Sequence, residues 1–310
     1  MTDLDLFPER PTQERPVPAD QSIYAPILDA SSETLRAVLE NVSGGYSGAL
    51  RGILTTEDGE RLFVKRGVSI GTIRACQREV EVLEILQSAG FSSLPKLLGA
   101  NETTLVQEDL SGRDFSDIWT PEKLVAAFEA MDELASIRPD ERLGRFSIVN
   151  GWDLMAKQPE LMKALRDLMG EDFDESIDES LEARALAAEM FLDSPGVVSH
   201  GDAHADNFAY DPVTETGKFI DWNWCGIAPP SMDTTELLVS VARSGYPLPE
   251  GLILEKCSAE ACQMLAGYWF SQCTQPAWEG GENIRAYQYE SALIAWDWHR
   301  LLSYQSGLHD

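Results

Sequence analysis

The stretch Ser199-His200-Gly201-Asp202-Ala203-His204-Ala205-Asp206-Asn207, with Phe219-Ile220-Asp221-Trp222 after it, decides how this chain is interpreted. It combines a carboxylate (Asp202), an amide five residues later (Asn207) and a second carboxylate behind apolar residues (Asp221). Transfer of a phosphoryl group from a nucleoside triphosphate requires hard oxygen ligands for Mg²⁺ and a group that orients the attacking hydroxyl. An amide and one carboxylate suit the metal, and a separate carboxylate suits the hydroxyl. The spacing matches the phosphoryl-transfer pattern H-x-D-x-x-x-x-N.

Two other interpretations of this stretch compete with phosphoryl transfer. Its polar residues alternate as the ligands of a zinc or two-metal hydrolase do on an extended strand: His200, Asp202, His204 and Asp206. Only two further histidines are present, His299 and His309, both close to the C-terminus, so a histidine-rich metal site would lack ligands. The other interpretation is an acidic loop without chemistry, but upstream segments supply the partners that phosphoryl transfer needs.

The segment from His200 to Asn207 resembles the H-G-D-x-H-x-x-N loop of the aminoglycoside phosphotransferase and choline kinase-like family. The segment Ile220-Asp221-Trp222 resembles the I-D-[WFP] metal strand of that family. The resemblance implies that Asp202 is the catalytic residue and that Asn207 and Asp221 bind Mg²⁺. It also implies an α+β, two-lobed protein-kinase-like fold with a small antiparallel-sheet N-lobe and a mostly helical C-lobe.

Length and composition fit a folded protein with a large core. The chain has 310 residues, 44% of them hydrophobic, and eight tryptophans, so two lobes are the natural expectation. No apolar run approaches the roughly twenty residues of a membrane helix. The acidic, proline-rich residues 1–20 do not resemble a signal peptide, and the five cysteines form no C-x-x-C pair. We therefore expect a cytoplasmic protein with reduced thiols.

The charge of the chain is strongly negative. Fifty-two acidic residues against 24 basic ones give a formal net charge of -28. Such a field repels nucleic acid and anionic membranes, so we expect neither as a partner. It favours a cationic substrate, although acids that only solubilise the surface explain the composition equally well.

The sequence predicts a flexible N-terminal arm (1–22) and then an N-lobe (23–106) that binds the nucleotide. Glycines between strands let backbone N–H groups approach phosphates, which makes three residues before the strand 50–55 candidates for that role: Gly44, Gly45 and Ser47. Lys65 lies near the end of the next strand, 61–66. Kinase-like folds hold the α- and β-phosphates with a lysine at this position. Strands at 94–100 and 104–107 complete an expected five-stranded antiparallel sheet.

An amphipathic helix is predicted over 72–89, and Glu79 lies on it. A buried lysine needs a counter-ion, so Glu79 is expected to pair with Lys65. The alternative is that Glu79 is one of several exposed acids on this helix.

A hinge is expected at 107–113. The resemblance implies that the backbones of Gln107 and Asp109 read the adenine there. The C-lobe, 114–310, is expected to carry the catalytic loop and the acceptor pocket. Its periodicity predicts helices over the following ranges: 121–137, 152–169, 177–192, 252–275 and 283–304. Asp233 matches a family acid that supports the catalytic loop, and His204 either packs beneath the loop or reaches a phosphate.

These features predict an enzyme that uses ATP (or GTP) and Mg²⁺ to move the γ-phosphoryl group to a hydroxyl of a small molecule. Charge and resemblance favour a cationic, aminoglycoside-like antibiotic as acceptor, and hence antibiotic resistance. Within the resembled family the alternatives are an amino alcohol, a sugar, an amino acid or a macrolide. A nucleotide-binding module without catalysis is the alternative of a different class. The sequence identifies neither the acceptor nor the oligomeric state.

Overall fold

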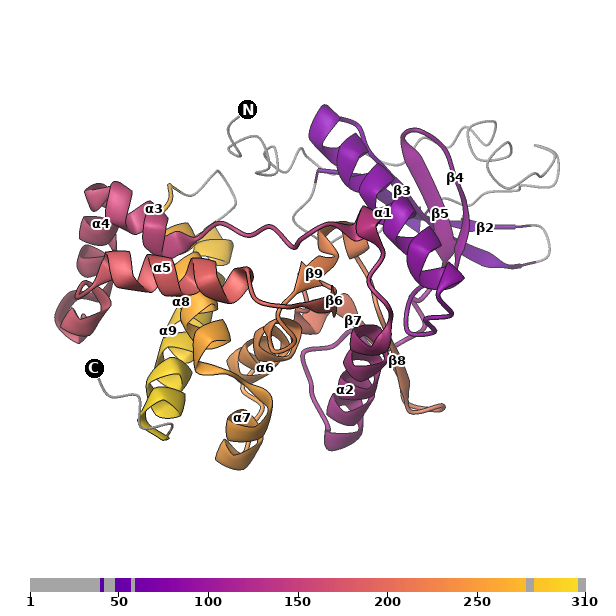
Figure 1. Ribbon diagram of the computed structural model, residues 1–310. Helices are drawn as coiled ribbons and strands as arrows, with labels where there is room; N and C mark the ends of the chain where they lie inside the picture. The colour runs from indigo at the N-terminus through magenta and orange to yellow at the C-terminus, as the bar shows by residue number, and fades with distance from the viewer. Residues whose placement is uncertain (1–39, 42–47, 57–58, 277–281, 306–310) are drawn as a thin grey trace. The chain divides into compact units, whose positions relative to one another are not determined.

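The computed structural model describes residues 40–41, 48–56, 59–276 and 282–305, and the chain divides into two compact units (Figure 1). The sheet unit comprises Met1–Phe115 with Phe208–Trp224, and the helical unit comprises Ser116–Asn207 with Cys225–Asp310. Phe208–Trp224 thus belongs to the sheet unit, whereas the predicted C-lobe, 114–310, includes it. Several predictions lie outside the described residues: the arm 1–22 and the phosphate-loop residues Gly44, Gly45 and Ser47.

The sheet unit contains a five-stranded antiparallel sheet in the order β1-β2-β3-β5-β4. Its strands are β1 (Glu40–Asn41), β2 (Leu50–Thr55), β3 (Arg61–Arg66), β4 (Leu97–Ala100) and β5 (Thr104–Glu108). Lys65 of β3 lies opposite Arg51 of β2 and Leu105 of β5, so it stands inside the sheet. The predicted antiparallel sheet is confirmed.

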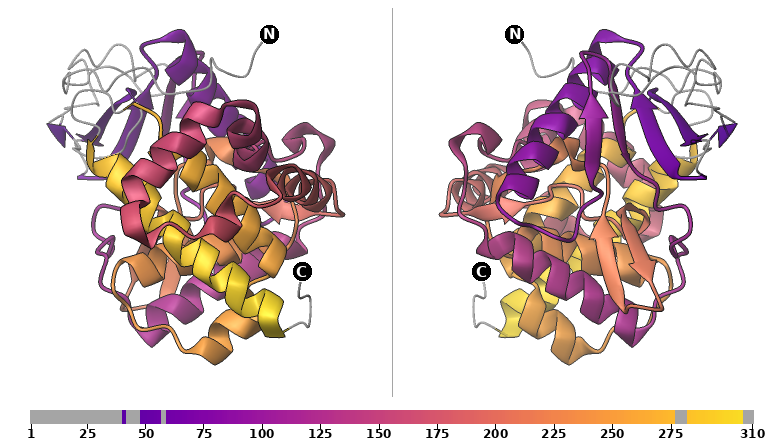
Figure 2. Two further views of the ribbon diagram at one scale, coloured as in Figure 1. Left: turned by 90° about the vertical axis from the view of Figure 1, so that its left-hand side faces the viewer. Right: turned by 90° about the vertical axis from the view of Figure 1, so that its right-hand side faces the viewer.

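Helix α1 (Ile70–Ser88) packs against this sheet and contacts β3, β4 and β5 (Figures 1 and 2). Its first turn is closed by a capping box, in which Ser69 accepts from the backbone N–H of Thr72. The buried face of the helix combines apolar residues such as Val82 and Leu86 with one acid, Glu79.

A hairpin of β7 (Phe208–Asp211) and β8 (Thr216–Phe219) also belongs to the sheet unit. The backbone N–H of Phe219 donates to the carbonyl of Ser93 at 3.0 Å, and Trp222 packs edge-on against Phe91. Trp222, in the short helix η7 (Trp222–Trp224), is fully buried and donates its indole N–H to the carbonyl of Phe219. Asp221 is therefore held between a paired strand and a buried tryptophan.

The helical unit contains most of the remaining elements. Its helices are α2 (Pro121–Ser136), α3 (Gly151–Lys157), α4 (Pro159–Met169), α5 (Leu181–Leu192), α6 (Met232–Arg243), α7 (Glu250–Lys256), α8 (Ala259–Cys273) and α9 (Glu282–Gln305). Short 3-10 turns are η3 (Glu141–Leu143), η4 (Gly170–Asp172), η5 (Glu175–Ile177) and η6 (Ala205–Asn207), and one strand pair joins β6 (Val197–Ser199) to β9 (Gly226–Ala228). The predicted mostly helical part is confirmed.

Two of the predicted helices are wrong in extent because each breaks in two. The helix predicted over 152–169 ends at Gln158, which adopts φ −126° and ψ 83°, since a residue before proline is pushed away from the helical region. The helix predicted over 252–275 is interrupted by Cys257 in extended conformation, after which Ser258 caps α8 by accepting from Ala261 N–H. The helix predicted over 177–192 begins later, at Leu181.

The core of the helical unit is tightly packed around Trp152. Its indole N–H donates to the carbonyl of Gln263 at 2.8 Å. A Cβ on Gly267 would lie 2.3 Å from the indole nitrogen, so only glycine allows this close approach of α3 to α8. Helix α9 lies along α8 (Figure 2).

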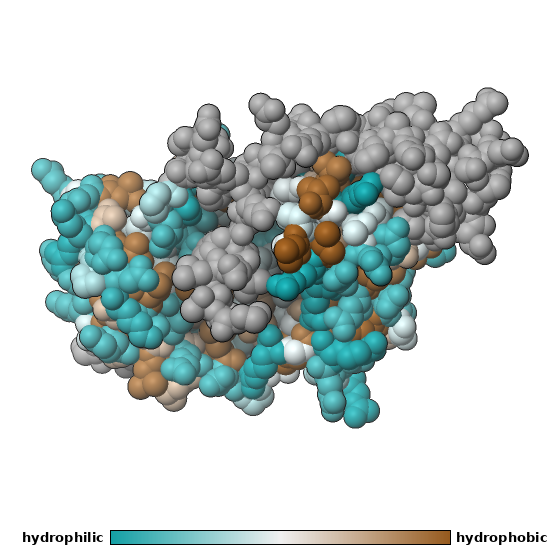
Figure 3. Space-filling view, turned by 90° about the horizontal axis from the view of Figure 1, so that it is seen from above, coloured by the Kyte–Doolittle hydropathy of each residue, from teal (hydrophilic) through white to brown (hydrophobic). Residues whose placement is uncertain are grey.

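Hydrophilic residues dominate the described surface that Figure 3 shows, as expected for a chain with 25% charged residues. None of the helices in the described part of the chain combines the length and the hydropathy required to span a membrane.

Candidate active site

Lys65 forms a buried cluster with two carboxylates of the sheet unit. Its Nζ lies 2.7 Å from Glu79 Oε2 and 2.6 Å from Asp221 Oδ1, and the residue is only 4% exposed. Burial alone would lower the pKa of Lys65, but the charges of Asp221 and Glu79 outweigh it and raise the pKa. The structure thus brings together three residues that the sequence singled out, and the lysine keeps its positive charge.

Asp221 has an unusual backbone conformation. Its φ is 64°, in the left-handed region that non-glycine residues seldom adopt. Such a residue costs about 1–3 kcal/mol and persists where the surroundings hold it, as at active sites. The amide of Asn223, oriented to satisfy its hydrogen bonds, donates to Asp221 Oδ1 at 2.7 Å. The side chain is 30% exposed, and its hard oxygens fit Mg²⁺.

The loop from Ser199 to Asn207 in the helical unit fixes the Asp202 carboxylate from two sides. Asn207 Nδ2 donates to Asp202 Oδ2 at 3.0 Å and to the Asp202 carbonyl at 2.8 Å. His204 Nε2 lies 3.1 Å from the other oxygen, Oδ1. Because the amide nitrogen of Asn207 is committed to Asp202, the amide oxygen is the atom that suits a metal ion. The Asp202 side chain remains 28% exposed.

One face of α6 holds the backbone of this loop. Asp233 accepts hydrogen bonds from the backbone N–H groups of His200 (2.6 Å) and Gly201 (3.0 Å) and from the Ser199 hydroxyl (2.5 Å). One turn later Glu236 accepts from Ala203 N–H at 3.1 Å, and Ser240 accepts from Ala205 N–H at 3.0 Å. The three polar residues are spaced i, i+3 and i+7, which places them on one side of a helix.

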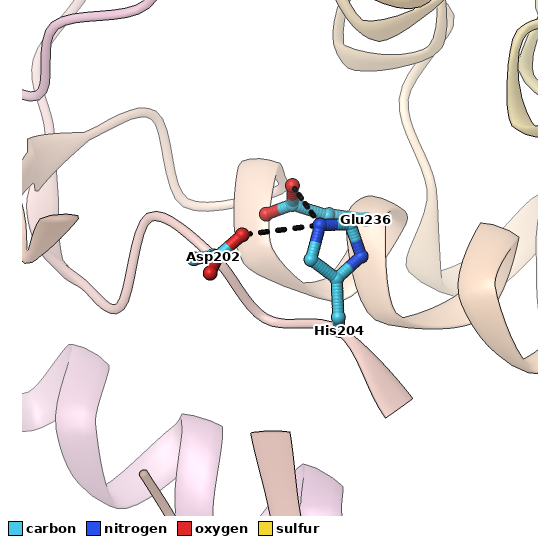
Figure 4. A group of neighbouring side chains, drawn as sticks. All are labelled: Asp202, His204 and Glu236. Carbon is cyan, nitrogen blue, oxygen red and sulfur yellow. Dashed lines mark ion pairs between the residues drawn. The ribbon is translucent and has the colours of Figure 1, made fainter. Parts of the chain in front are cut away.

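His204 lies between two carboxylates (Figure 4). Its Nε2 is 3.6 Å from Glu236 Oε1 and 3.1 Å from Asp202 Oδ1, while Nδ1 is 2.6 Å from the Tyr287 hydroxyl. Burial alone would lower the pKa of His204, but the neighbouring carboxylates, Asp202 above all, raise it to about 10. Burial raises the pKa of Glu236 to about 7. The imidazole therefore carries its positive charge at neutral pH.

Sequence reasoning missed Glu236, Ser240 and Tyr287. The signal for the first two was present, because Glu236 and Ser240 follow Asp233 at i+3 and i+7, a spacing that places all three on one side of a helix. Tyr287 comes from α9 and had no local signal. For His204 the sequence left two positions open, and the structure directs its ring toward Asp202.

The predicted hinge needs a correction at Gln107. This residue lies inside β5, opposite Phe63 of β3 and Leu97 of β4, so the connector begins after Glu108. A hydrogen bond from the backbone of Gln107 to adenine would compete with the backbone hydrogen bonds that pair β5 with its neighbouring strands. Its side chain is 4% exposed, and within the described part of the chain Oε1 has no hydrogen-bond partner. Such an orphaned acceptor suits the amino group of a purine.

Asp109 lies in the connector after β5. Its carboxylate accepts from Arg61 Nε at 2.7 Å and from Ser111, through both the backbone N–H and the hydroxyl. The side chain therefore stabilises the connector. The adenine contact predicted for its backbone stays a prediction.

Comparison with protein families gives a match over most of the chain. Residues 38–267 match the model of the family described as "Phosphotransferase enzyme family". A comparison with curated proteins gave no match.

Solved structures share the fold over almost their whole length. An aminoglycoside phosphotransferase from Alicyclobacillus acidocaldarius subsp. acidocaldarius DSM 446 is 13% identical, with a TM-score of 0.57, and the match covers 94% of this chain and 95% of that one. The ADP-bound aminoglycoside phosphotransferase APH(2'')-Ib is 15% identical, with a TM-score of 0.53 and coverage of 90% and 99%. APH(2")-IIia in complex with GDP and kanamycin is 14% identical, with a TM-score of 0.53 and coverage of 92% and 98%. The predicted fold class is confirmed.

Proposed function

The chain belongs to the phosphotransferase enzyme family, and from this membership we propose that it transfers the γ-phosphoryl group of ATP, bound with Mg²⁺, to a hydroxyl of a small molecule. The observation that carries the proposal is the buried cluster in which Lys65 Nζ contacts both Glu79 and Asp221. Asp221 lies 156 positions from Lys65 in the sequence. Each of the three residues has a distinct task in phosphoryl transfer: phosphate binding, orientation of the lysine and metal binding.

Each proposed role follows from the chemistry of one side chain. Asp202 orients the acceptor hydroxyl and takes its proton late in a loose transition state. Lys65 binds the α- and β-phosphates, and Glu79 orients it. Asn207 and Asp221 supply oxygen ligands for Mg²⁺, which neutralises phosphate charge when bound.

Nucleotide binding draws on the sheet unit. We assign phosphate contacts to the backbone around Gly44, Gly45 and Ser47 on the basis of sequence, and base recognition to the connector after Glu108, with the Gln107 side chain behind it. Both adenine and guanine remain candidates, because the similar structures include one bound to ADP and one bound to GDP.

A cationic acceptor is the form of the proposal that we favour. The net charge of -28 attracts polyamines. Among the similar structures, one holds kanamycin together with GDP, and another, with a TM-score of 0.51, holds streptomycin together with ATP. Aminoglycosides are therefore the first acceptors to test.

The decisive experiment measures ADP release from Mg-ATP with a panel of acceptors: kanamycin, streptomycin, choline, a free sugar, an amino alcohol, a hydroxy amino acid and a macrolide. We expect one class to stimulate release well above the rate with water alone, and mass spectrometry to detect the phosphorylated product. Tight Mg-ATP binding without stimulation by any acceptor would favour a nucleotide-binding module. Weak nucleotide binding would contradict the proposal altogether.

The Asp221→Asn variant tests the metal role. We expect affinity for Mg-ATP to fall about 10–100-fold, because a charge-assisted contact of roughly 1.5–3 kcal/mol is lost. Affinity for ATP in EDTA should stay the same or rise, since one negative charge is removed near the phosphates. Isothermal titration calorimetry with and without Mg²⁺ separates the two quantities.

The matched control is Glu215→Gln, which removes one charge from the exposed β7–β8 turn of the same unit. It should leave both affinities unchanged. If Asp221→Asn instead weakens ATP binding equally with and without Mg²⁺, Asp221 serves to place Lys65 and does not bind the metal.

A further inference from the structure

His204 is a side chain in the catalytic loop whose contacts go beyond the roles proposed above. Its Nε2 faces Asp202 Oδ1 at 3.1 Å, on the opposite side of the carboxylate from Asn207, which donates to Oδ2 at 3.0 Å. Asp202 is thus held at both oxygens by two residues of its own loop. Each carboxylate oxygen has two acceptor sites, so these contacts leave capacity for a substrate hydroxyl.

The imidazole ring is itself fixed from outside the loop. Tyr287 of α9 contacts Nδ1 at 2.6 Å, and Arg243 of α6 lies over the tyrosine ring at 3.9 Å from its centroid. Glu236 of α6 lies 3.6 Å from Nε2 and is 5% exposed. Its second oxygen accepts from Ala203 N–H. Glu236 of α6 and Tyr287 of α9 therefore set the orientation of the ring.

We propose that His204 is a positioning residue for phosphoryl transfer: it holds Oδ1 of Asp202, while Tyr287 and Glu236 hold the ring. The inference rests on the proposed function, because it assigns His204 to the same reaction. Nε2 lies 3.1 Å from Oδ1 of the Asp202 carboxylate, an oxygen that accepts hydrogen bonds, so Nε2 carries a proton and donates. Without this donor the carboxylate would keep only its contact with Asn207 and could turn away from the acceptor hydroxyl. Small displacements of a base are costly, because proton transfer needs hydrogen-bond reach.

Two amide variants of His204 distinguish the role of Nε2 from the role of Nδ1. Glutamine extends its amide about as far as His Nε2, so His204→Gln keeps a donor toward Asp202. Asparagine extends only about as far as Nδ1, so His204→Asn loses that donor but retains a polar group toward Tyr287. We expect kcat of His204→Asn to be about tenfold or more below that of His204→Gln. The KM for ATP and for the acceptor should differ between the variants by less than about twofold.

A spectroscopic measurement tests the contact without any acceptor. With ring-¹⁵N-labelled histidine, His204→Gln identifies the His204 signals among the four histidines. In the wild type we expect an Nε2-bound proton that exchanges slowly with water and whose shift changes in Asp202→Asn. Tyr287→Phe, which keeps the aromatic ring, should move the Nδ1 signal and lower kcat in the same direction as His204→Asn, by a smaller factor.

The two hypotheses fail in different ways. If the wild type transfers no phosphoryl group to any acceptor, the proposed function is wrong, but the protected Nε2 proton still reports on the contact. If His204→Asn and His204→Gln have equal kcat and KM, or if the Nε2 proton exchanges freely, the positioning role is wrong.

A divalent cation is the competing occupant of this cluster. The ligand atoms of Asp202, His204 and Glu236 lie within 4.8 Å of one another, a spacing that also suits a metal ion. Calorimetric titration of the nucleotide-free protein with Mn²⁺ and Zn²⁺ tests this. Binding that disappears in His204→Asn and persists in Asp221→Asn would overturn the positioning role in favour of a metal site.

Discussion

Replacing Asp202 by asparagine is expected to lower kcat by a factor on the order of a hundred or more, with little change in affinity for Mg-ATP. The amide keeps the size of the side chain and can still accept from Asn207, but it cannot take a proton from the acceptor hydroxyl. Steady-state kinetics with the acceptor found by the ADP-release panel, together with calorimetry of Mg-ATP binding, measures both quantities.

The same loop offers a matched control. Asp206 is exposed, and Asp206→Asn removes one negative charge without touching the proposed base, so kcat should stay within about twofold of the wild type. An Asp202→Asn variant that loses nucleotide affinity in proportion to kcat would show that Asp202 acts in nucleotide binding and not as the base.

Replacing Asp233 by alanine is expected to give the largest loss of stability. Its carboxylate is 7% exposed and accepts from the Ser199 hydroxyl and from two backbone N–H groups. Removing it leaves three buried donors without their acceptor, which we expect to cost about 3–5 kcal/mol in the free energy of unfolding. Since domains are stable by only about 5–15 kcal/mol, urea unfolding monitored by tryptophan fluorescence should show a clear shift of the midpoint.

Two further variants make this prediction specific. Asp233→Asn keeps one acceptor oxygen and should cost less than Asp233→Ala. Asp132→Ala removes an exposed acid from α2 and should change stability by no more than about 0.5 kcal/mol. Equal stability of Asp233→Ala and Asp132→Ala would mean that the loop backbone finds other acceptors, and that Asp233 does not organise it.

Much of the sheet unit was predictable because its signals are local. The strands 50–55 and 61–66 were predicted with the bounds that the structure gives, since alternation and the Glu57-Asp58-Gly59 turn sequence fix both ends. The pairing of Lys65 with Glu79 was predictable because a buried ammonium requires a counter-ion. The strand predicted over 104–107 contains Gln107 as the structure does, but the predicted hinge starts too early, since nothing in the sequence marks that β5 continues to Glu108.

In the helical unit, periodicity predicted where helices lie but not where they break. Pro159 is the local signal for the break at Gln158, because a residue before proline is pushed away from the helical region. Cys257 carries no comparable signal, because its extended backbone is set by packing and by the cap at Ser258. In the sheet unit, the hairpin strand β7 was missed because its partner β8 was interpreted only as the strand leading to Asp221.

The sequence by itself determined the chemistry: an acid, an amide and a second acid at spacings that suit phosphoryl transfer, with a lysine on a strand. Tertiary structure decided which side chains those groups contact. It brought Asp221 to Lys65 across 156 positions, and it placed Glu236 and Tyr287 around His204. The physical reason is that spacing along a chain specifies which side chains share one loop or one helix face. The partners that bury, charge and orient those side chains come from other elements, and only packing brings them within hydrogen-bond distance.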